Sequence, residues 1–249
     1  MAATLSVRHL TLGEGRPKII VPIVAKTESD ILLSAQKAAA HPLVDLVEWR
    51  ADHYIAAPDT DAICEMLRKL RDILKEKPLL FTFRTRREGG EQAMDDTAYL
   101  ALCEAAAQCG AADLIDVEMF SRQAEACVAR VHAHRVSVVG SWHDFAQTPG
   151  ERDLIARFQN MQDMGADVLK IAVMPKCLED VTHLISAAKK VHASAARPLC
   201  AISMGDTGCI TRTHCAHFGG CMTFGALDAA SAPGQISVKA LHEALQSGC

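Results

Sequence analysis

The sequence predicts a single-domain (β/α)8 barrel, and three features of the chain carry this prediction. Its 249 residues match the usual size of one such barrel. Short runs rich in Val, Ile and Leu recur along the chain, as expected for parallel strands buried on both faces. The segments between these runs are long enough for crossover helices, so we expect one catalytic domain over residues 1–249.

Eight apolar runs form the expected strands. They are KIIVPIVA (18–25), LVDLVEWR (43–50), PLLFTFR (78–84), ADLIDVE (112–118), VSVVGSWHD (136–144), ADVLKIAV (166–173), PLCAISM (198–204) and CMTFGA (221–226). Helical segments lie between them, such as DAICEMLRKLRDILKEK after the second run and DVTHLISAAKKVHASAA after the sixth. Eight alternating units favour a closed barrel over a doubly wound sheet, whose first strand usually leads into a Gly-rich phosphate turn. Here the first run leads into KTESD.

An additional hairpin is expected before the barrel. Residues 4–12 alternate apolar and polar side chains and end at GEG. We expect this hairpin to cover the N-terminal end of the barrel.

Composition and charge exclude several classes of function. The net charge of −4 and the isoelectric point near 6.2 are weak, and the cationic residues form no basic stripe, so nucleic acid is not an expected partner. The N-terminus lacks the apolar core of a signal peptide, and no apolar run approaches the ~18 residues needed to span a bilayer. We therefore expect a cytoplasmic protein that does not bind membranes.

The ten cysteines are scattered, and no pair has C-x-x-C spacing, so most are expected to be small buried side chains. One cluster, His214, Cys215, His217 and Cys221, has residue types that could bind zinc. Its spacing matches no common zinc module, and THCAHFGG resembles a helix end with its glycine stop. We expect no metal and no cofactor.

Polar residues end the apolar runs, where the active sites of such barrels lie. These residues, all expected to converge on one pocket, are Glu48, Arg50, Arg84, Glu118, His143 and Lys170.

Lys170 is the most informative of them because it lies between apolar neighbours in LKIAV. Burial disfavours a charged amine, and an uncharged amine is a nucleophile toward ketones. Guanidinium groups of Arg50, Arg84 and Arg212 would disfavour the charge further. The alternative is a structural lysine that reaches solvent or pairs with a core carboxylate.

His143 in SWHDF lies at the end of the strand next to that of Lys170, and a neutral imidazole can take a carbon-bound proton and return it to a leaving hydroxyl. Glu88, in RTRREGGEQ, could orient the ring. The alternatives are a core histidine and a solvated loop carboxylate.

Two loops complete the expected site. MGDTGCITR (204–212) places glycines and backbone amides beside Arg212, which suits a carboxylate. SAPGQ (231–235) is typical of a surface turn that could close over a ligand with Ser231 and Gln235.

Taken in order, these segments resemble the type I 3-dehydroquinate dehydratases, the Schiff-base dehydroquinases of the shikimate pathway. The resemblance extends over almost the whole chain, through GEGRPKIIV, LVEWRADH, KPLLFTFRTRREGGEQ, SWHDF, GADVLKIAVMP, MGDTGCITR and TFGALDAASAPGQISV. It implies a lyase, usually homodimeric, that converts 3-dehydroquinate to 3-dehydroshikimate and water without metal or cofactor. That reaction serves the biosynthesis of aromatic amino acids.

The resemblance also implies a role for each site residue. Lys170 matches the Schiff-base lysine, His143 the general acid and base, and Glu88 the acid that partners the histidine. The positions that match substrate-binding residues are Glu48, Arg50, Arg84, Met204, Arg212, Ser231 and Gln235. The chain departs from the family pattern at Pro22, Thr211 and Gly220, none of which is a residue assigned to chemistry.

Two other functions fit the same residues. A Schiff-base aldolase or transaldolase would use the same lysine but would break a carbon–carbon bond, so its product would not retain every substrate carbon. A non-catalytic binding barrel would keep the pocket without turnover.

Overall fold

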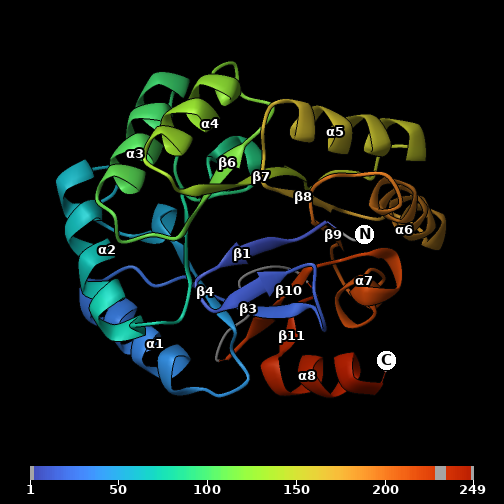
Figure 1. Ribbon diagram of the computed structural model, residues 1–249, viewed down its shortest axis with the longest axis horizontal. Helices are drawn as coiled ribbons and strands as arrows, with labels where there is room; N and C mark the ends of the chain where they lie inside the picture. Colours follow the sequence, from blue (N-terminus) through green and yellow to red (C-terminus); the bar gives the residue numbers. More distant parts are fainter. Residues whose placement is uncertain (1–2, 228–233, 248–249) are drawn as a thin grey trace.

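The computed structural model, which describes residues 3–227 and 234–247, confirms the predicted barrel. Eight parallel strands form the barrel: β3 to β9 are hydrogen-bonded in chain order, β10 pairs with β3, and helices surround them (Figure 1). The strands are β3 (Lys18–Ile23), β4 (Leu46–Arg50), β5 (Leu79–Thr82), β6 (Leu114–Glu118), β7 (Ser137–Asp144), β8 (Val168–Val173), β9 (Leu199–Ser203) and β10 (Met222–Ala226). A parallel bridge between Leu199 and Gly220 closes the ring between β9 and β10. A short strand, β11 (Ile236–Ser237), extends from β10.

Helices alternate with these strands as the sequence predicts. The α-helices are α1 (Glu28–Ala40), α2 (Thr60–Leu74), α3 (Asp96–Gln108), α4 (Ala124–Ala133), α5 (Glu151–Asp163), α6 (Leu178–His192), α7 (Ile210–Thr213) and α8 (Val238–Ser247). The side chains of Thr27, Asp59 and Asp95 accept backbone N–H groups at the starts of α1, α2 and α3, which fixes where these helices begin. Within the described residues, no helix is both long and apolar enough to cross a membrane.

Alternation along each strand divides its side chains between two cores. On β8, Leu169, Ile171 and Val173 face the helices, whereas Val168 and Ala172 belong to the cluster inside the barrel. Lys170 lies between Val168 and Ala172 in this alternation and so points into the barrel. The same alternation places charged side chains of the other strands inside.

The N-terminal hairpin consists of β1 (Leu5–Val7) and β2 (Leu10–Leu12), paired antiparallel as predicted. Val7 and Leu12 are buried in the interior cluster of the barrel. Arg8 pairs with Asp113, just before the start of β6, with 2.6 Å between Nε and Oδ1. The hairpin therefore covers the N-terminal end and leaves the opposite end for the active site.

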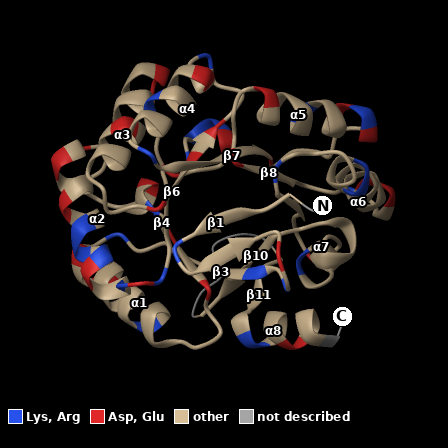
Figure 2. Ribbon diagram, viewed as in Figure 1, with Lys and Arg blue, Asp and Glu red and all other residues tan. Residues whose placement is uncertain are grey.

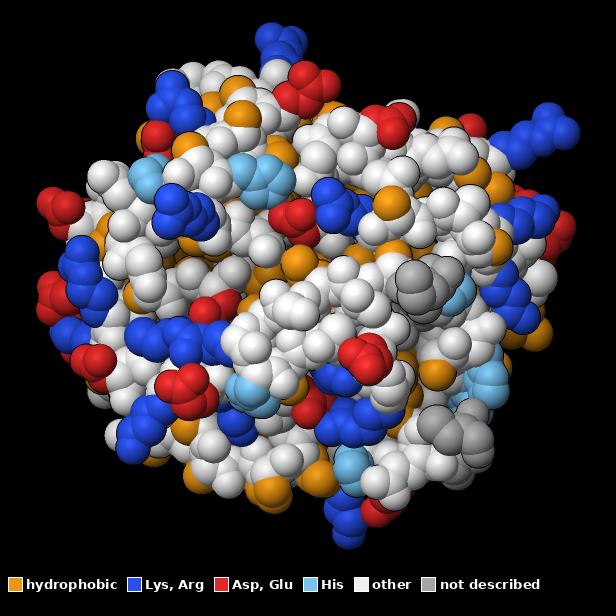
Figure 3. Space-filling model, viewed as in Figure 1, with side chains coloured by type: hydrophobic (Ala, Val, Ile, Leu, Met, Phe, Trp, Pro, Cys, Tyr) orange, Lys and Arg blue, Asp and Glu red, His pale blue; other side chains and the backbone are white. Residues whose placement is uncertain are grey.

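The outer surface carries mixed charges. Lys and Arg alternate with Asp and Glu around the helices (Figure 2), and the face seen in Figure 3 carries no large patch of one sign. This distribution agrees with the weak net charge.

Of the possible zinc ligands, Cys215 and His217 lie in a short 3-10 helix, η3 (Cys215–Phe218), which ends at Gly219 with a left-handed φ of 84°; His214 precedes this helix and Cys221 follows it. Burial raises the pKa of Cys215 to about 12, which disfavours the thiolate that zinc binds. Among the described residues, no group of three or more His, Cys, Asp or Glu side chains is placed to hold a metal ion.

Candidate active site

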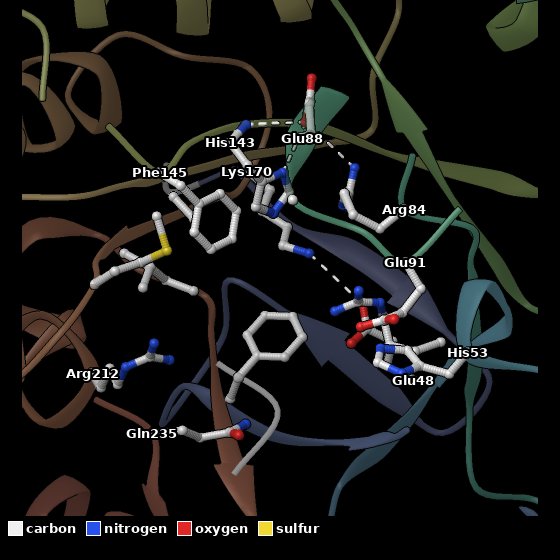
Figure 4. A pocket seen from close by; sticks show the side chains of 16 residues that line it. Glu48, His53, Arg84, Glu88, Glu91, His143, Phe145, Lys170, Arg212 and Gln235 are labelled. Atoms are coloured by element: carbon white, nitrogen blue, oxygen red, sulfur yellow. Dashed lines mark hydrogen bonds and ion pairs between the residues drawn. The ribbon is translucent and has the colours of Figure 1, made fainter. Parts of the chain in front are cut away.

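A pocket opens at the C-terminal end of the barrel, and most of the predicted polar residues line it (Figure 4). Its lining consists of Glu48, Arg50, His53, Arg84, Glu88, Gly89, Glu91, His143, Phe145, Lys170, Ala172, Ile202, Met204, Arg212, Phe224 and Gln235. Ser231 lies outside the described residues. Glu118 is absent from the lining, so the prediction that all six residues at the strand ends share the pocket is wrong for this residue.

Lys170 is 4% exposed, and its Nζ points into the pocket. Two carboxylates contact the amine: Asp116 Oδ2 lies 3.2 Å from Nζ and Glu48 Oε1 lies 3.8 Å from it. The ring centroid of Phe224 is 4.7 Å from the same nitrogen. The ion pairs of Lys170 are therefore with carboxylates, as the alternative interpretation had it, and not with the guanidinium groups that the sequence led us to expect nearby.

Asp116 is the carboxylate beside Lys170 that sequence reasoning missed. It lies two positions before Glu118 in ADLIDVE and so faces the barrel interior with it. Two acidic residues alternating with apolar ones inside a buried strand were the available signal. The order of the strands along the chain does not by itself give which side chain of another strand reaches Lys170 inside the barrel.

Arg84 links the carboxylates behind the pocket. Its Nη2 lies 2.7 Å from Asp116 Oδ1, and its Nη1 lies 3.3 Å from Glu118 Oε1 and 3.4 Å from Glu88 Oε2. Burial by itself would lower the pKa of Arg84, but these three carboxylates raise it well above its usual value. Glu118 also accepts the backbone N–H of Thr85 at 2.7 Å, and it thereby anchors the loop after β5.

His143 and Glu88 form a direct pair. Glu88 Oε2 lies 2.9 Å from His143 Nδ1 and 3.0 Å from the backbone N–H of the same histidine. Because Oε2 already accepts the backbone N–H of His143, we assign it as the acceptor of the ring N–H as well, so Nδ1 carries the proton and Nε2 keeps its lone pair. Burial, together with the positive charges of Arg84 and Lys170, holds the pKa of His143 well below its usual value. The imidazole is therefore neutral at pH 7 and available as a base.

A tight turn positions Glu88. The 3-10 helix η2 (Arg86–Glu88) ends at Gly89, which has a left-handed φ of 83°. At Gly90 a Cβ atom would lie 1.9 Å from the carbonyl oxygen of Arg84, so only glycine fits there. Burial raises the pKa of Glu88 to about 8, against the opposing effect of Arg84.

Glu48 and Arg50 lie on β4, and each has a partner that fixes it. Thr82 Oγ1 donates to Glu48 Oε1 at 2.8 Å. Arg50 makes a bidentate pair with Asp52, with Nε and Nη2 at 2.8 and 2.9 Å from its two oxygens. Both side chains are thus oriented before any ligand binds.

Arg212 and Gln235 lie across the pocket from His53 (Figure 4). Arg212 follows Gly208, where a Cβ would lie 2.2 Å from the carbonyl oxygen of Ser203. Thr211, one of the departures from the family pattern, accepts the Ser203 N–H at 2.9 Å and donates to the Gly208 carbonyl oxygen at 2.8 Å. These bonds fix the backbone that presents Arg212.

The fold and the pocket together define a class of protein: a (β/α)8-barrel enzyme with a buried lysine, a neutral imidazole and a cationic side chain at the C-terminal end of the barrel.

Comparisons with known proteins identify the family within this class. The family model for type I 3-dehydroquinase matches residues 19–248. A 3-dehydroquinate dehydratase of Bacillus licheniformis is 43% identical, with 98% of this chain and 97% of the relative covered. The crystal structure of type I 3-dehydroquinate dehydratase from Clostridium difficile, with covalent modified comenic acid, has a TM-score of 0.95 at 39% identity and covers 99% of this chain and 98% of its own. The structure from Enterococcus faecalis has a TM-score of 0.91 at 38% identity, with 98% of each chain covered. The chain belongs to the type I 3-dehydroquinase family.

Proposed function

We propose that this chain dehydrates 3-dehydroquinate to 3-dehydroshikimate and water through a Schiff base on Lys170, within the shikimate pathway of aromatic amino acid biosynthesis. The observation that carries the proposal is the position of the Lys170 amine, which is buried in a pocket shared with a neutral His143. Family membership supports the substrate and the hydro-lyase reaction.

The imine supplies what the imidazole alone lacks. A proton at C2, beside a ketone, is too weakly acidic for rapid removal by histidine, and a protonated imine at the neighbouring carbon acts as an electron sink. Lys170 condenses with the ketone and releases water, and His143 then removes the C2 proton to give an enamine. The enamine expels the adjacent hydroxyl group, which leaves as water with the proton from His143. Hydrolysis of the imine frees the product.

Glu88 orients the histidine in this scheme. Its contact with Nδ1 directs the free Nε2 into the pocket, and it stabilises the imidazolium that forms after proton removal.

The remaining residues bind the substrate. Arg212 pairs with the carboxylate, and Gln235 and Ser231 add hydrogen bonds at the same end, as the family resemblance implies. Glu48 and Arg50, oriented by their partners, bind hydroxyl groups, Met204 packs near the ring, and Arg84 sets the charge of the site. None of these steps uses a metal or a cofactor.

We further propose a homodimer of single-domain chains that acts in the cytoplasm. The homodimer rests on the family resemblance. All nine cysteines among the described residues are free thiols, which fits a reducing compartment.

An ultraviolet assay tests the function directly, because dehydration of 3-dehydroquinate creates a conjugated enone. The proposal expects absorbance to rise with enzyme concentration and the product to retain every substrate carbon by mass spectrometry. A product with fewer carbons would identify an aldolase. If no product forms, the alternative of a non-catalytic binding barrel would be supported instead.

A further inference from the structure

The carboxylate of Asp116 lies against the reacting amine, yet the scheme above gives it no part. It is 1% exposed on β6, and its Oδ2 lies 3.2 Å from Lys170 Nζ. Its other oxygen, Oδ1, accepts from Arg84 Nη2 at 2.7 Å and from Ser141 Oγ at 2.6 Å. Three donors from three places in the barrel therefore converge on one buried carboxylate.

These donors keep Asp116 ionised. Burial would raise its pKa, but the positive charges of Arg84 and Lys170 and the Ser141 hydroxyl group hold the pKa below its usual value. Asp116 is therefore a fixed negative charge beside Nζ throughout the neutral pH range.

We propose that Asp116 is the counter-ion that keeps the imine nitrogen of Lys170 protonated. The proposal rests on the Schiff-base function proposed above. When an ammonium group condenses with a ketone and water leaves, one positive charge remains on nitrogen. That charge disappears when His143 takes the C2 proton to form the enamine, and it returns when the hydroxyl group departs. A counter-ion in contact with this nitrogen stabilises each protonated state and thereby maintains the electron sink.

The other groups that face the nitrogen lie further from it or carry no negative charge. Glu48 on β4 is further away, at 3.8 Å, and its Oε1 also accepts from Thr82. Burial raises the pKa of Cys200 on β9 to about 12, so its thiol is neutral, and His143 on β7 is neutral as well. Phe224 on β10 contributes only the face of its ring at 4.7 Å. Asp116 is thus the nearer of the two carboxylates that contact Nζ among the described residues.

The test is the pH dependence of kcat, which reports groups in the enzyme–substrate complex. Asp116→Asn keeps the shape of the side chain but removes its charge. An opposite charge in contact raises the pKa of a protonated nitrogen by about 1–3 units. Without the charge of Asp116, the alkaline limb of kcat should therefore move to lower pH by about that amount. Borohydride trapping, which needs a protonated imine, should decline over the same lower pH range.

Glu118→Gln is the matched control. Glu118 is buried on the same strand and contacts Arg84, but it does not contact Lys170. Loss of the Glu118 charge should leave the alkaline limb of kcat at the same pH as in the wild-type enzyme. An equal movement of the limb in both variants, or a fall in kcat without movement in Asp116→Asn, would overturn the counter-ion proposal.

Two further measurements keep the proposal separable from folding and from the function itself. If Asp116→Asn does not fold, Asp116→Ser removes the same charge with a smaller side chain and should move the limb in the same direction; an unmoved limb in that variant contradicts the proposal. Wild-type turnover of 3-dehydroquinate and a borohydride adduct on Lys170 are measured first, because their absence refutes the Schiff-base function. If the wild-type enzyme turns over normally but the alkaline limb of Asp116→Asn does not move, the counter-ion proposal is refuted and the Schiff-base function is not.

Discussion

Glu88→Gln should reduce activity in a manner that depends on pH. The pKa of Glu88 is raised to about 8, so the carboxyl group is mostly protonated at pH 7 and mostly ionised at pH 9. Glutamine has the shape of the neutral acid and keeps an oxygen for the two N–H groups of His143. Below pH 7 the variant should therefore approach the wild-type kcat/KM.

The difference should appear as pH rises through 8. An ionised Glu88 in contact with Nδ1 raises the basicity of His143 by about 1–3 pH units. If about half of this gain reaches the rate of proton removal, the wild-type enzyme gains roughly 3- to 30-fold. Glutamine cannot ionise, so this rise is missing from the variant.

The assay is kcat/KM from pH 6 to pH 9.5, which reports ionisations of the free enzyme. Glu91→Gln is the control, because Glu91 lines the same pocket and has no hydrogen bond to His143 among those described. It should keep the rise near pH 8. A Glu88→Gln variant that is as impaired at pH 6.5 as at pH 9 would show that Glu88 is ionised in the free enzyme, and the reasoning would be wrong.

Three other outcomes are expected. His143→Ala should lose about 10²–10⁴-fold in turnover yet still form an imine that borohydride traps, and near-normal turnover would remove this residue from the mechanism. Gln235→Ala should raise KM more than it changes kcat, whereas an unchanged KM would deny it a part in binding. Leu12→Ala should lower the free energy of unfolding by about 2–5 kcal/mol in denaturant titrations, because Leu12 is fully buried at the N-terminal end of the barrel; a loss below that range would mean that the hairpin is not integral to the core.

The fold was predictable because its signals are local. Each strand is an apolar run of β-forming residues, each crossover is long enough for a helix, and the alternation of the first residues marks the hairpin. Strand ends were predicted less well: the first run extends to residue 25, whereas β3 ends at Ile23. The run continues in apolar residues beyond the point where hydrogen bonds to the neighbouring strand stop.

The site was predictable in its residues but not in all its contacts. Strand alternation and the family resemblance select Lys170, His143 and Glu88. Contacts across the barrel depend on strand stagger and on side-chain conformation, which sequence does not give. The pairing of Lys170 with Asp116, and the position of Glu118 behind Arg84, therefore required the structure.

Borohydride reduction in the presence of 3-dehydroquinate, followed by peptide mass mapping, tests the central claim most directly. Lys170→Arg is the control, because arginine keeps the positive charge beside Asp116 but forms no imine. The account predicts irreversible inactivation with one adduct per chain on the peptide that contains Lys170, and no adduct in the control. An active preparation with no adduct, or with the adduct on another lysine, would contradict it.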